Sequence, residues 1–201
     1  MWLESFLFVL TLTVACSPWD LVQSWSHQKS SHQNAFFPFL MAPFSSMLWI
    51  IYGQQMKNEF LTFTNTMTFF IGMDFLAMYI HFYKKSLQQI RIMMALAIFI
   101  CFECIYLQLP MQYICVLASL LNTFSPLVVA KHVITTKNSS CMSKYLTLLN
   151  VSSTTFWTIY GFAIHDAWIG FVNMLNLILA ITQLFLYFIF ENKKPVIIIE
   201  V

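Results

Sequence analysis

The chain has 201 residues, of which 59% are hydrophobic and only 9% are charged, whereas soluble domains are about 45–50% apolar and about 25% charged. Ten basic and eight acidic residues are too few to cover the surface of a soluble domain, and 17% aromatic residues with only four glycines exclude a disordered or collagen-like chain. The composition therefore indicates an integral membrane protein.

Polar breaks divide the sequence into apolar runs close to the roughly 20 residues that a membrane-spanning helix needs. In chain order we predict spanning helices over 2–19, 36–53, 61–83, 89–107, 111–133, 145–163 and 167–190. A β-barrel would need strands of alternating polarity, but runs such as Met93–Cys101 and Leu175–Phe190 are nearly continuously apolar. The predicted fold class is an all-α membrane protein with seven transmembrane helices.

The basic residues predict how the chain is oriented. With seven spans, nine of the ten basic residues share one side, and only Lys57 lies on the other. The nine are Lys29, Lys84, Lys85, Arg91, Lys131, Lys137, Lys144, Lys193 and Lys194. Because basic loops stay in the cytosol, we expect an N-terminus that is outside or lumenal and a cytosolic C-terminus. No basic residue precedes Lys29, which argues against a cleaved signal peptide. The plasma membrane is the expected location, with the Golgi or another endomembrane as the alternative.

The sequence repeats itself at an offset of 108 residues. Residues 17–65 align without a gap on residues 125–173, and 12 of the 49 positions are identical. The identical positions include Pro, Trp and Gly, which are scarce in this chain. Trp49-Ile-Ile-Tyr-Gly53 aligns on Trp157-Thr-Ile-Tyr-Gly161. The chain is therefore predicted to contain an internal structural repeat.

The repeat predicts the domain organisation. Spans one to three (1–86) recur as spans five to seven (110–191), a single linker span (87–109) joins them, and 192–201 is a short cytosolic tail. One intervening span gives both repeats the same orientation, which makes this a parallel repeat in a 3+1+3 arrangement. Transporters built in this way bind substrate near the membrane midplane, between the repeats.

These features together resemble the SWEET family of sugar facilitators. The resemblance covers about residues 17–190 and is carried by Ser17-Pro18, by Pro38 fifteen residues before Gly53, by Ser125-Pro126-Leu127, Val133–Lys137, Trp157–Gly161, Asp166 and Asn173, and by Gln183–Tyr187. The related PQ-loop transporters carry Pro-Gln where Ser-Pro stands here, and this chain has no Pro-Gln. The resemblance implies mono- or disaccharide transport by alternating access and assembly as homo-oligomers.

The resemblance implies that Asn65, Asn173 and Trp157 bind the sugar. The internal repeat adds Trp49, the counterpart of Trp157, although the family often has a small polar residue at that position. A buried amide in lipid is costly unless it is hydrogen-bonded, and Asn offers both donors and an acceptor to sugar hydroxyls. Trp can lay its ring against a sugar while its N–H donates a hydrogen bond. The alternatives are an interhelical hydrogen bond for each Asn and an interfacial aromatic belt for each Trp.

The resemblance also implies gates and hinges. Lys57 and Asp166 would form an outer gate beside Tyr52 and Tyr160, the alternative being two solvated loop charges. Pro18, Pro38 and Pro126 are expected to interrupt their helices and to act as hinges of the inner gate; the alternative is a static kink at each.

The chain departs from the family pattern at three positions. The family's proline of span six is Ser143 here, the proline before the Asn of span seven is Val172, and a nearby glycine is Asn176. Asp74 and Glu103 are acids within spans, which a proton-coupled carrier could use, but Asp74 has no counterpart in the second repeat. We therefore favour uniport.

No nucleotide-binding, GxSxG or HExxH motif is present, so we expect neither enzyme activity nor a cofactor or metal site. The expected partners are sugar, the lipid bilayer and further copies of the chain, without nucleic acid. The predicted function is energy-independent, bidirectional facilitative sugar transport. The alternatives are a PQ-loop-type carrier of another small metabolite and a non-transporting membrane adaptor. A seven-helix receptor is disfavoured because it would lack the repeat.

Overall fold

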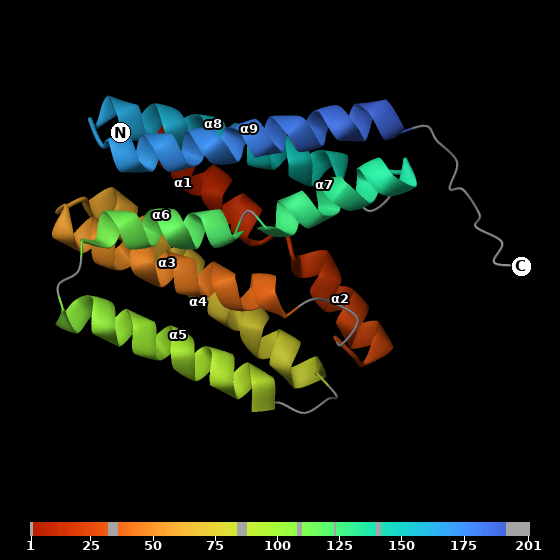
Figure 1. Ribbon diagram of the computed structural model, residues 1–201, viewed down its shortest axis with the longest axis horizontal. Helices are drawn as coiled ribbons and strands as arrows, with labels where there is room; N and C mark the ends of the chain where they lie inside the picture. Colours follow the sequence, from red (N-terminus) through yellow and green to blue (C-terminus); the bar gives the residue numbers. More distant parts are fainter. Residues whose placement is uncertain are drawn as a thin grey trace, which may run out of the picture. The chain divides into compact units, whose positions relative to one another are not determined.

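The computed structural model describes residues 2–31, 36–83, 88–107, 110–122, 124–139 and 142–191. Within these ranges all regular secondary structure is helical (Figure 1). The helices are α1 (Trp2–Ala15), α2 (Trp19–Gln28), α3 (Phe37–Gln55), α4 (Glu59–Phe82), α5 (Gln88–Tyr106), α6 (Met111–Asn122), α7 (Phe124–Thr136), α8 (Lys144–Ala163) and α9 (Ala167–Phe190). The predicted tail 192–201 and Lys84, Lys85, Lys193 and Lys194 lie outside the described residues.

Two of the predicted spans are formed by pairs of shorter helices. The first span divides into α1 and α2, which continues to Gln28, well past the predicted end at residue 19. Proline has no N–H and starts a helix more easily than it continues one, and Pro18 lies immediately before α2. The fifth span divides into α6 and α7. The other five spans correspond to α3, α4, α5, α8 and α9.

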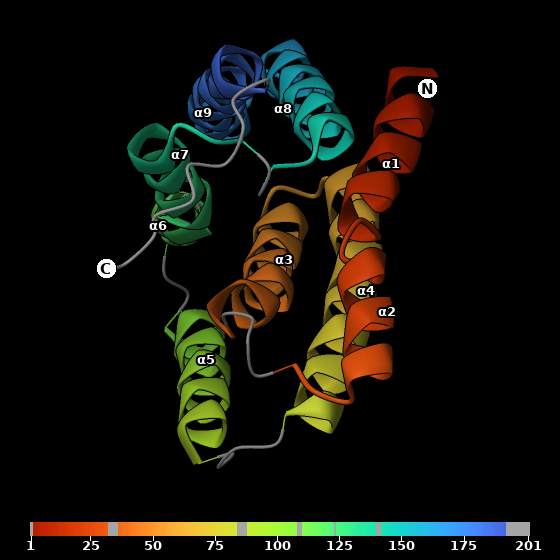
Figure 2. The same ribbon diagram turned by 90° about the vertical axis from the view of Figure 1, so that its right-hand side faces the viewer.

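The chain forms two compact units, Met1–Ser119 and Leu120–Val201, with the boundary inside α6. In the first unit α3 packs along α4, the broken pair α1 and α2 packs against α4, and α5 packs against α3 (Figure 2). In the second unit α8 packs along α9, and α7 also contacts α9. Each unit therefore contains one long, closely packed antiparallel pair.

An aromatic cluster holds the end of the first unit that lies farthest from the α3–α4 turn. Trp25 of α2 and Tyr79 of α4 are both 1% exposed and meet edge to face, and Phe39 of α3 stacks on Tyr79. The fully buried Ser31 ties the chain after α2 to this cluster, since its N–H donates to the carbonyl of Phe82 and its hydroxyl donates to that of Tyr79. Both carbonyls belong to the last turn of α4, where no intrahelical donor remains.

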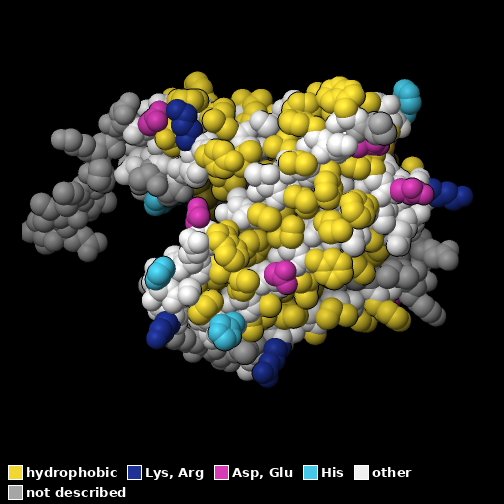
Figure 3. Space-filling model, turned by 180° about the vertical axis from the view of Figure 1, so that it is seen from behind, with side chains coloured by type: hydrophobic (Ala, Val, Ile, Leu, Met, Phe, Trp, Pro, Cys, Tyr) yellow, Lys and Arg dark blue, Asp and Glu magenta, His cyan; other side chains and the backbone are white. Residues whose placement is uncertain are grey.

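The surface suits a lipid environment. Hydrophobic side chains dominate the face shown in Figure 3, and large apolar residues such as Phe70, Phe102 and Phe185 are at least 60% exposed. By length and composition alone, the stretches Trp2–Gln28 and Ala167–Phe190 could cross a membrane. Helices α3, α4 and α8 are also long, with 19, 24 and 20 residues.

Two close helix–helix approaches lie at glycines of the sequence repeat. A Cβ added to Gly53 of α3 would lie 2.6 Å from the Thr62 hydroxyl of α4. A Cβ added to Gly161 of α8 would lie 2.7 Å from the Cα of Gly170 in α9. Gly53 and Thr62 correspond to Gly161 and Gly170 at the offset of 108. An added side chain would meet backbone at Gly161, whereas at Gly53 it would first meet the hydroxyl of Thr62.

The turns that follow these glycines have the same hydrogen bonds in both units. The N–H of Asn58 donates to the carbonyl of Gly53 at 2.8 Å, and the N–H of Asp166 donates to that of Gly161 at 2.9 Å. The residues just before, Lys57 and His165, both have left-handed backbones, with φ of 54° and 57°. Helix α9 begins and ends 108 residues after α4. The predicted repeat is thus also a repeat of local geometry.

Gly161→Ala is expected to destabilise the protein by about 1–3 kcal/mol, which is the usual effect of overpacking. The added methyl would meet the backbone of α9, which cannot rotate away as a side chain can. By helix propensity alone, Ala in place of Gly would stabilise the helix by about 1 kcal/mol. A loss of stability would therefore point to the steric clash. The thermal unfolding midpoint in detergent measures it. Ala163→Val, at the exposed end of the same helix, is the control, and a Gly161→Ala midpoint at or above wild type would contradict the steric argument.

Candidate functional site

Asn65 and Asn173 have the same environment in their respective units. Both side chains are half-buried. The Nδ2 of Asn65 donates to the carbonyl of Leu61 at 2.9 Å, and the Nδ2 of Asn173 donates to that of Ile169, also at 2.9 Å. Within the described part of the chain, neither Oδ1 accepts a hydrogen bond. Each amide is therefore held by one N–H, while its oxygen and second N–H stay available to a ligand.

Trp49 and Trp157 are each braced by a tyrosine on the same helix. The Trp49 ring meets the Tyr52 ring edge to face, with centroids 5.5 Å apart, and Trp157 meets Tyr160 in the same way at 5.6 Å. Tyr52 and Tyr160, predicted as gate residues, are only 2% and 3% exposed. Their rings fix the orientation of the neighbouring indoles, since edge-to-face contact is a favoured aromatic geometry.

A serine that sequence analysis missed contacts the first of these tryptophans. The indole Nε1 of Trp49 donates to the Oγ of Ser119 in α6, at 3.3 Å. Ser119 is 7% exposed and lies 70 residues away along the chain. The repeat contained a weak signal for it, because Ser119 aligns on another hydroxyl residue, Thr11. The Trp49 N–H, which we expected to donate to a sugar, thus already has a partner.

Small hydroxyl side chains are also buried on α3 and α4. Ser45 and Ser46 of α3 are buried, as is Thr64 of α4. The hydroxyls of Ser46 and Thr68 lie 3.0 Å apart and link the two helices. The buried Thr64 hydroxyl has no hydrogen-bond partner among the described residues. Apolar periodicity does not reveal such contacts, because they depend on which faces meet.

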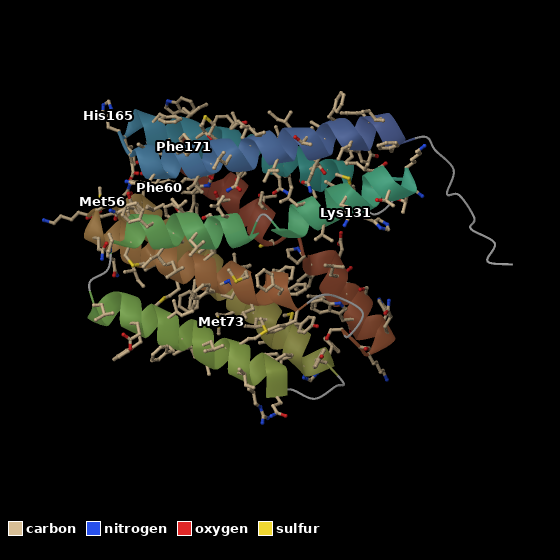
Figure 4. The ribbon with its side chains drawn as sticks, viewed as in Figure 1. Met56, Phe60, Met73, Lys131, His165 and Phe171 are labelled. Atoms are coloured by element: carbon tan, nitrogen blue, oxygen red, sulfur yellow. The ribbon has the colours of Figure 1, made fainter. Side chains whose placement is uncertain are left out.

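At the α8–α9 turn, Asp166 caps a helix. Its Oδ1 accepts hydrogen bonds from the N–H groups of Trp168 and Ile169 at 3.0 and 3.1 Å, and the residue is only 8% exposed. The alternative of a solvated loop charge is therefore wrong for Asp166. Asn58, its counterpart in the first unit, caps α4 in the same way. Lys57 is exposed. Figure 4 shows its neighbour Met56 at the α3–α4 turn and His165 at the α8–α9 turn.

The three predicted hinge prolines have different positions. Pro18 lies between α1 and α2, which confirms the expected interruption. Pro38 interrupts nothing, so that expectation is wrong: it lies in the first turn of α3, where a missing N–H is harmless. The proline inside α3 is instead Pro43, which packs against Gly72. Pro126 is the third residue of α7.

Two further residues bear on the sequence predictions. Ser143, where the family has a proline, caps α8 by accepting a hydrogen bond from the N–H of Leu146 at 3.3 Å. Asp74 is exposed on α4 and lies nine residues after Asn65, which is half a turn away around a helix of 3.6 residues per turn. The two side chains therefore lie on opposite faces of α4. Within the described ranges no group of three or more His, Cys, Asp and Glu residues could hold a metal ion.

The model of a known protein family, described as a sugar efflux transporter for intercellular exchange, matches residues 1–87 and 110–195. The chain belongs to this family. The two matched segments flank α5, and they contain every residue discussed above as a candidate for binding or gating.

Named members of the family resemble most of this chain. It is 25% identical over 207 residues to the bidirectional sugar transporter SWEET16 of Arabidopsis thaliana, an alignment that covers 94% of this chain and 88% of that protein. It is 27% identical over 202 residues to SWEET15 of Oryza sativa subsp. indica, of which the alignment covers 63%, and again 94% of this chain. The resemblance to the SWEET family is therefore confirmed.

A solved structure of a eukaryotic SWEET transporter has the same fold. It superposes with a TM-score of 0.84 at 18% sequence identity, covering 95% of this chain and 96% of that one. The predicted all-α, seven-span membrane fold is confirmed by this similarity and by the family assignment.

Proposed function

We propose that this protein transports sugars across a membrane in both directions, by alternating access and without energy coupling. The observation that carries the proposal is the pairing of a braced Trp with a half-buried Asn on each long helix pair. Trp49 and Asn65 lie on α3 and α4, and Trp157 and Asn173 lie on α8 and α9. An aromatic face with a donor–acceptor amide suits a pyranose, which has apolar C–H faces and hydroxyls that both donate and accept.

The charge distribution supports a neutral substrate. Helices α3, α4 and α9 contain no Lys or Arg, so they offer no fixed cation to the carboxylate of an amino acid or of an anionic metabolite such as pyruvate. The named relatives are bidirectional sugar transporters. A PQ-loop-type carrier of another metabolite and a non-transporting adaptor are the outcomes that the experiment below must exclude.

The remaining features of the proposal concern mechanism and setting. Asp74 lies on the face of α4 opposite Asn65, which supports uniport over proton symport. We propose repeats 1–86 and 110–191 as the moving parts, and Pro18, Pro38 and Pro126 as hinges, with Pro38 acting at the start of α3. We further propose a plasma-membrane location with the N-terminus outside, assembly as a homo-oligomer, and no enzymatic activity.

Purified protein in proteoliposomes should exchange labelled glucose or sucrose for the unlabelled sugar in a counterflow assay. Because no coupling ion is involved, the exchange should persist with a protonophore and without ATP. Empty liposomes are the control. A labelled amino acid or pyruvate that exchanges in place of sugar would support the PQ-loop alternative, and loss of flux with the protonophore would support symport. No exchange of any solute would support the adaptor.

Asn173→Ala should lower sugar flux at least about tenfold at equal amounts of protein in the membrane. The alanine removes hydrogen bonds worth about 0.5–1.5 kcal/mol each between neutral groups, and the sugar gives up water to make them. Asn176→Ala, one turn farther along α9, is the matched control and should retain flux. Wild-type flux in Asn173→Ala would assign Asn173 to helix packing.

We propose that the Lys57 ammonium and the Asp166 carboxylate, together with Tyr52 and Tyr160, act as the outer gate. A screened surface pair contributes under about 1 kcal/mol, so gating requires that closure removes water from the charges. Asp166 also caps α9, so removing its side chain has two effects. Only a substitution that keeps the cap isolates the charge.

Asp166→Asn keeps an oxygen for both cap hydrogen bonds and removes the charge, whereas Asp166→Ala removes both. If the charge gates, Asp166→Asn and Lys57→Gln should each slow sugar flux, while the thermal midpoint of Asp166→Asn stays near wild type. Asp166→Ala should also lower the midpoint, because loss of a cap costs about 0.5–2 kcal/mol. Normal flux in both neutral variants would leave Asp166 with its capping role alone.

A further inference from the structure

The hydrogen bond between the Ser46 and Thr68 side chains lies one turn from the proposed binding residues. Ser46 precedes Trp49 by three residues on α3, and Thr68 follows Asn65 by three residues on α4. Residues three apart lie on the same face of a helix. Because α3 and α4 are antiparallel, Ser46 and Thr68 lie at the same level along the two helices. Trp49 and Asn65 lie at the next level, one turn closer to the α3–α4 turn.

Contacts between α3 and α4 therefore lie on both sides of the level of Trp49 and Asn65. Toward the turn, Gly53 lies against Thr62. Away from the turn, the hydroxyl oxygens of Ser46 and Thr68 are 3.0 Å apart, with Ser46 only 9% exposed. Thr68 also reaches the backbone carbonyl of Asn65 itself at 3.1 Å, so the bond acts directly on the turn of α4 that carries the amide.

Counting protons favours a hydrogen bond between the two hydroxyls. The pair makes three close contacts: Ser46 with the carbonyl of Ala42 at 3.0 Å, Ser46 with Thr68, and Thr68 with the carbonyl of Asn65. Two hydroxyls have only two protons to donate. If both protons went to the carbonyls, two oxygens would face each other at 3.0 Å without a proton between them. Either remaining arrangement keeps a hydrogen bond between α3 and α4.

The second unit lacks this link. The equivalents of Ser46 and Thr68 at the offset of 108 are Thr154 and Asn176. Thr154 donates within its own helix, to the carbonyls of Asn150 and Val151 at 2.7 and 3.2 Å. Among the described residues no hydrogen bond joins it to Asn176. The link is thus a property of the first unit and not a general requirement of the repeat.

We propose that Ser46 and Thr68 are positioning residues, which set the register of α3 and α4 and so place the amide of Asn65 relative to Trp49 for sugar binding. This inference rests on the proposed function. It predicts that loss of either hydroxyl weakens sugar binding, because the polar groups would no longer be held in the geometry that the sugar requires. Turnover at saturating sugar should change little.

The test measures concentration-dependent sugar counterflow in proteoliposomes at matched protein content. Thr68→Val removes the hydroxyl at nearly constant shape, and the apparent KM should rise about three- to tenfold, the range expected for one lost hydrogen bond. Ser46→Ala should give a similar rise. The double variant should be no worse than the worse single, because both changes break one interaction. Thr68→Ser keeps the hydroxyl and should therefore have the wild-type KM.

Thr66→Val is the matched control. Thr66 is half-buried on the same helix, and its hydroxyl donates only to the carbonyl of Thr62 within α4, at 2.8 Å. Its variant should keep the wild-type KM. The positioning role would be overturned if Thr66→Val and Thr68→Val had equal effects on KM. It would also be overturned if the effects of Ser46→Ala and Thr68→Val were additive. A third contrary result would be a fall in maximal flux and thermal midpoint at constant KM.

Sugar exchange by the wild-type protein distinguishes a failure of this inference from a failure of the proposed function. If wild type exchanges sugar and Thr68→Val has an unchanged KM, the inference alone fails. If wild type exchanges no sugar, the proposed function fails, and the positioning role fails with it.

Discussion

The arrangement at the α3–α4 turn and at the α8–α9 turn depends on the close approach of two helices at a glycine. A Cβ would meet the backbone of α9 at Gly161 and the Thr62 hydroxyl of α4 at Gly53, so glycine favours this spacing in both pairs. The same turn follows in both units, with a left-handed residue and then a side-chain cap on the next helix. This turn sets the register of each pair, and in both pairs the Trp lies four residues before the glycine and the Asn lies twelve residues after it.

In lipid, polar groups must find partners within the protein, since water cannot supply them. Most hydroxyls here donate to a carbonyl one turn back in their own helix, as Thr66 and Thr158 do. Such bonds satisfy a side chain without specifying a neighbour. A smaller group of bonds joins different elements: Ser31 to the end of α4, Trp49 to Ser119, and Ser46 to Thr68. These bonds specify the arrangement of the first unit.

The two units share a plan but differ in detail. Where α3 and α4 meet at Pro43 and Gly72 and are linked by hydroxyls, the equivalent positions of α8 and α9 hold Val151 and Ala180, with Thr154 bonded within its own helix. The glycine contact differs as well, because Gly53 meets a threonine and Gly161 meets a glycine backbone. A duplicated fold can therefore hold the same Trp and Asn side chains with different supporting contacts.

The sequence by itself determined the all-α membrane class, the spans, the internal repeat and the family, because each depends on composition or on residue identity at fixed spacing. It also pointed to Asn65, Asn173, Trp49 and Trp157 as a repeated set. Only the tertiary structure decided that Asp166 is a buried cap and that Pro38 begins a helix while Pro43 lies inside it. It also decided that Trp49 bonds to Ser119 and that Ser46 bonds to Thr68. Each of these depends on where a helix begins or on which faces of two helices meet. Hydrophobic periodicity leaves both open in a spanning helix that is apolar on nearly every side.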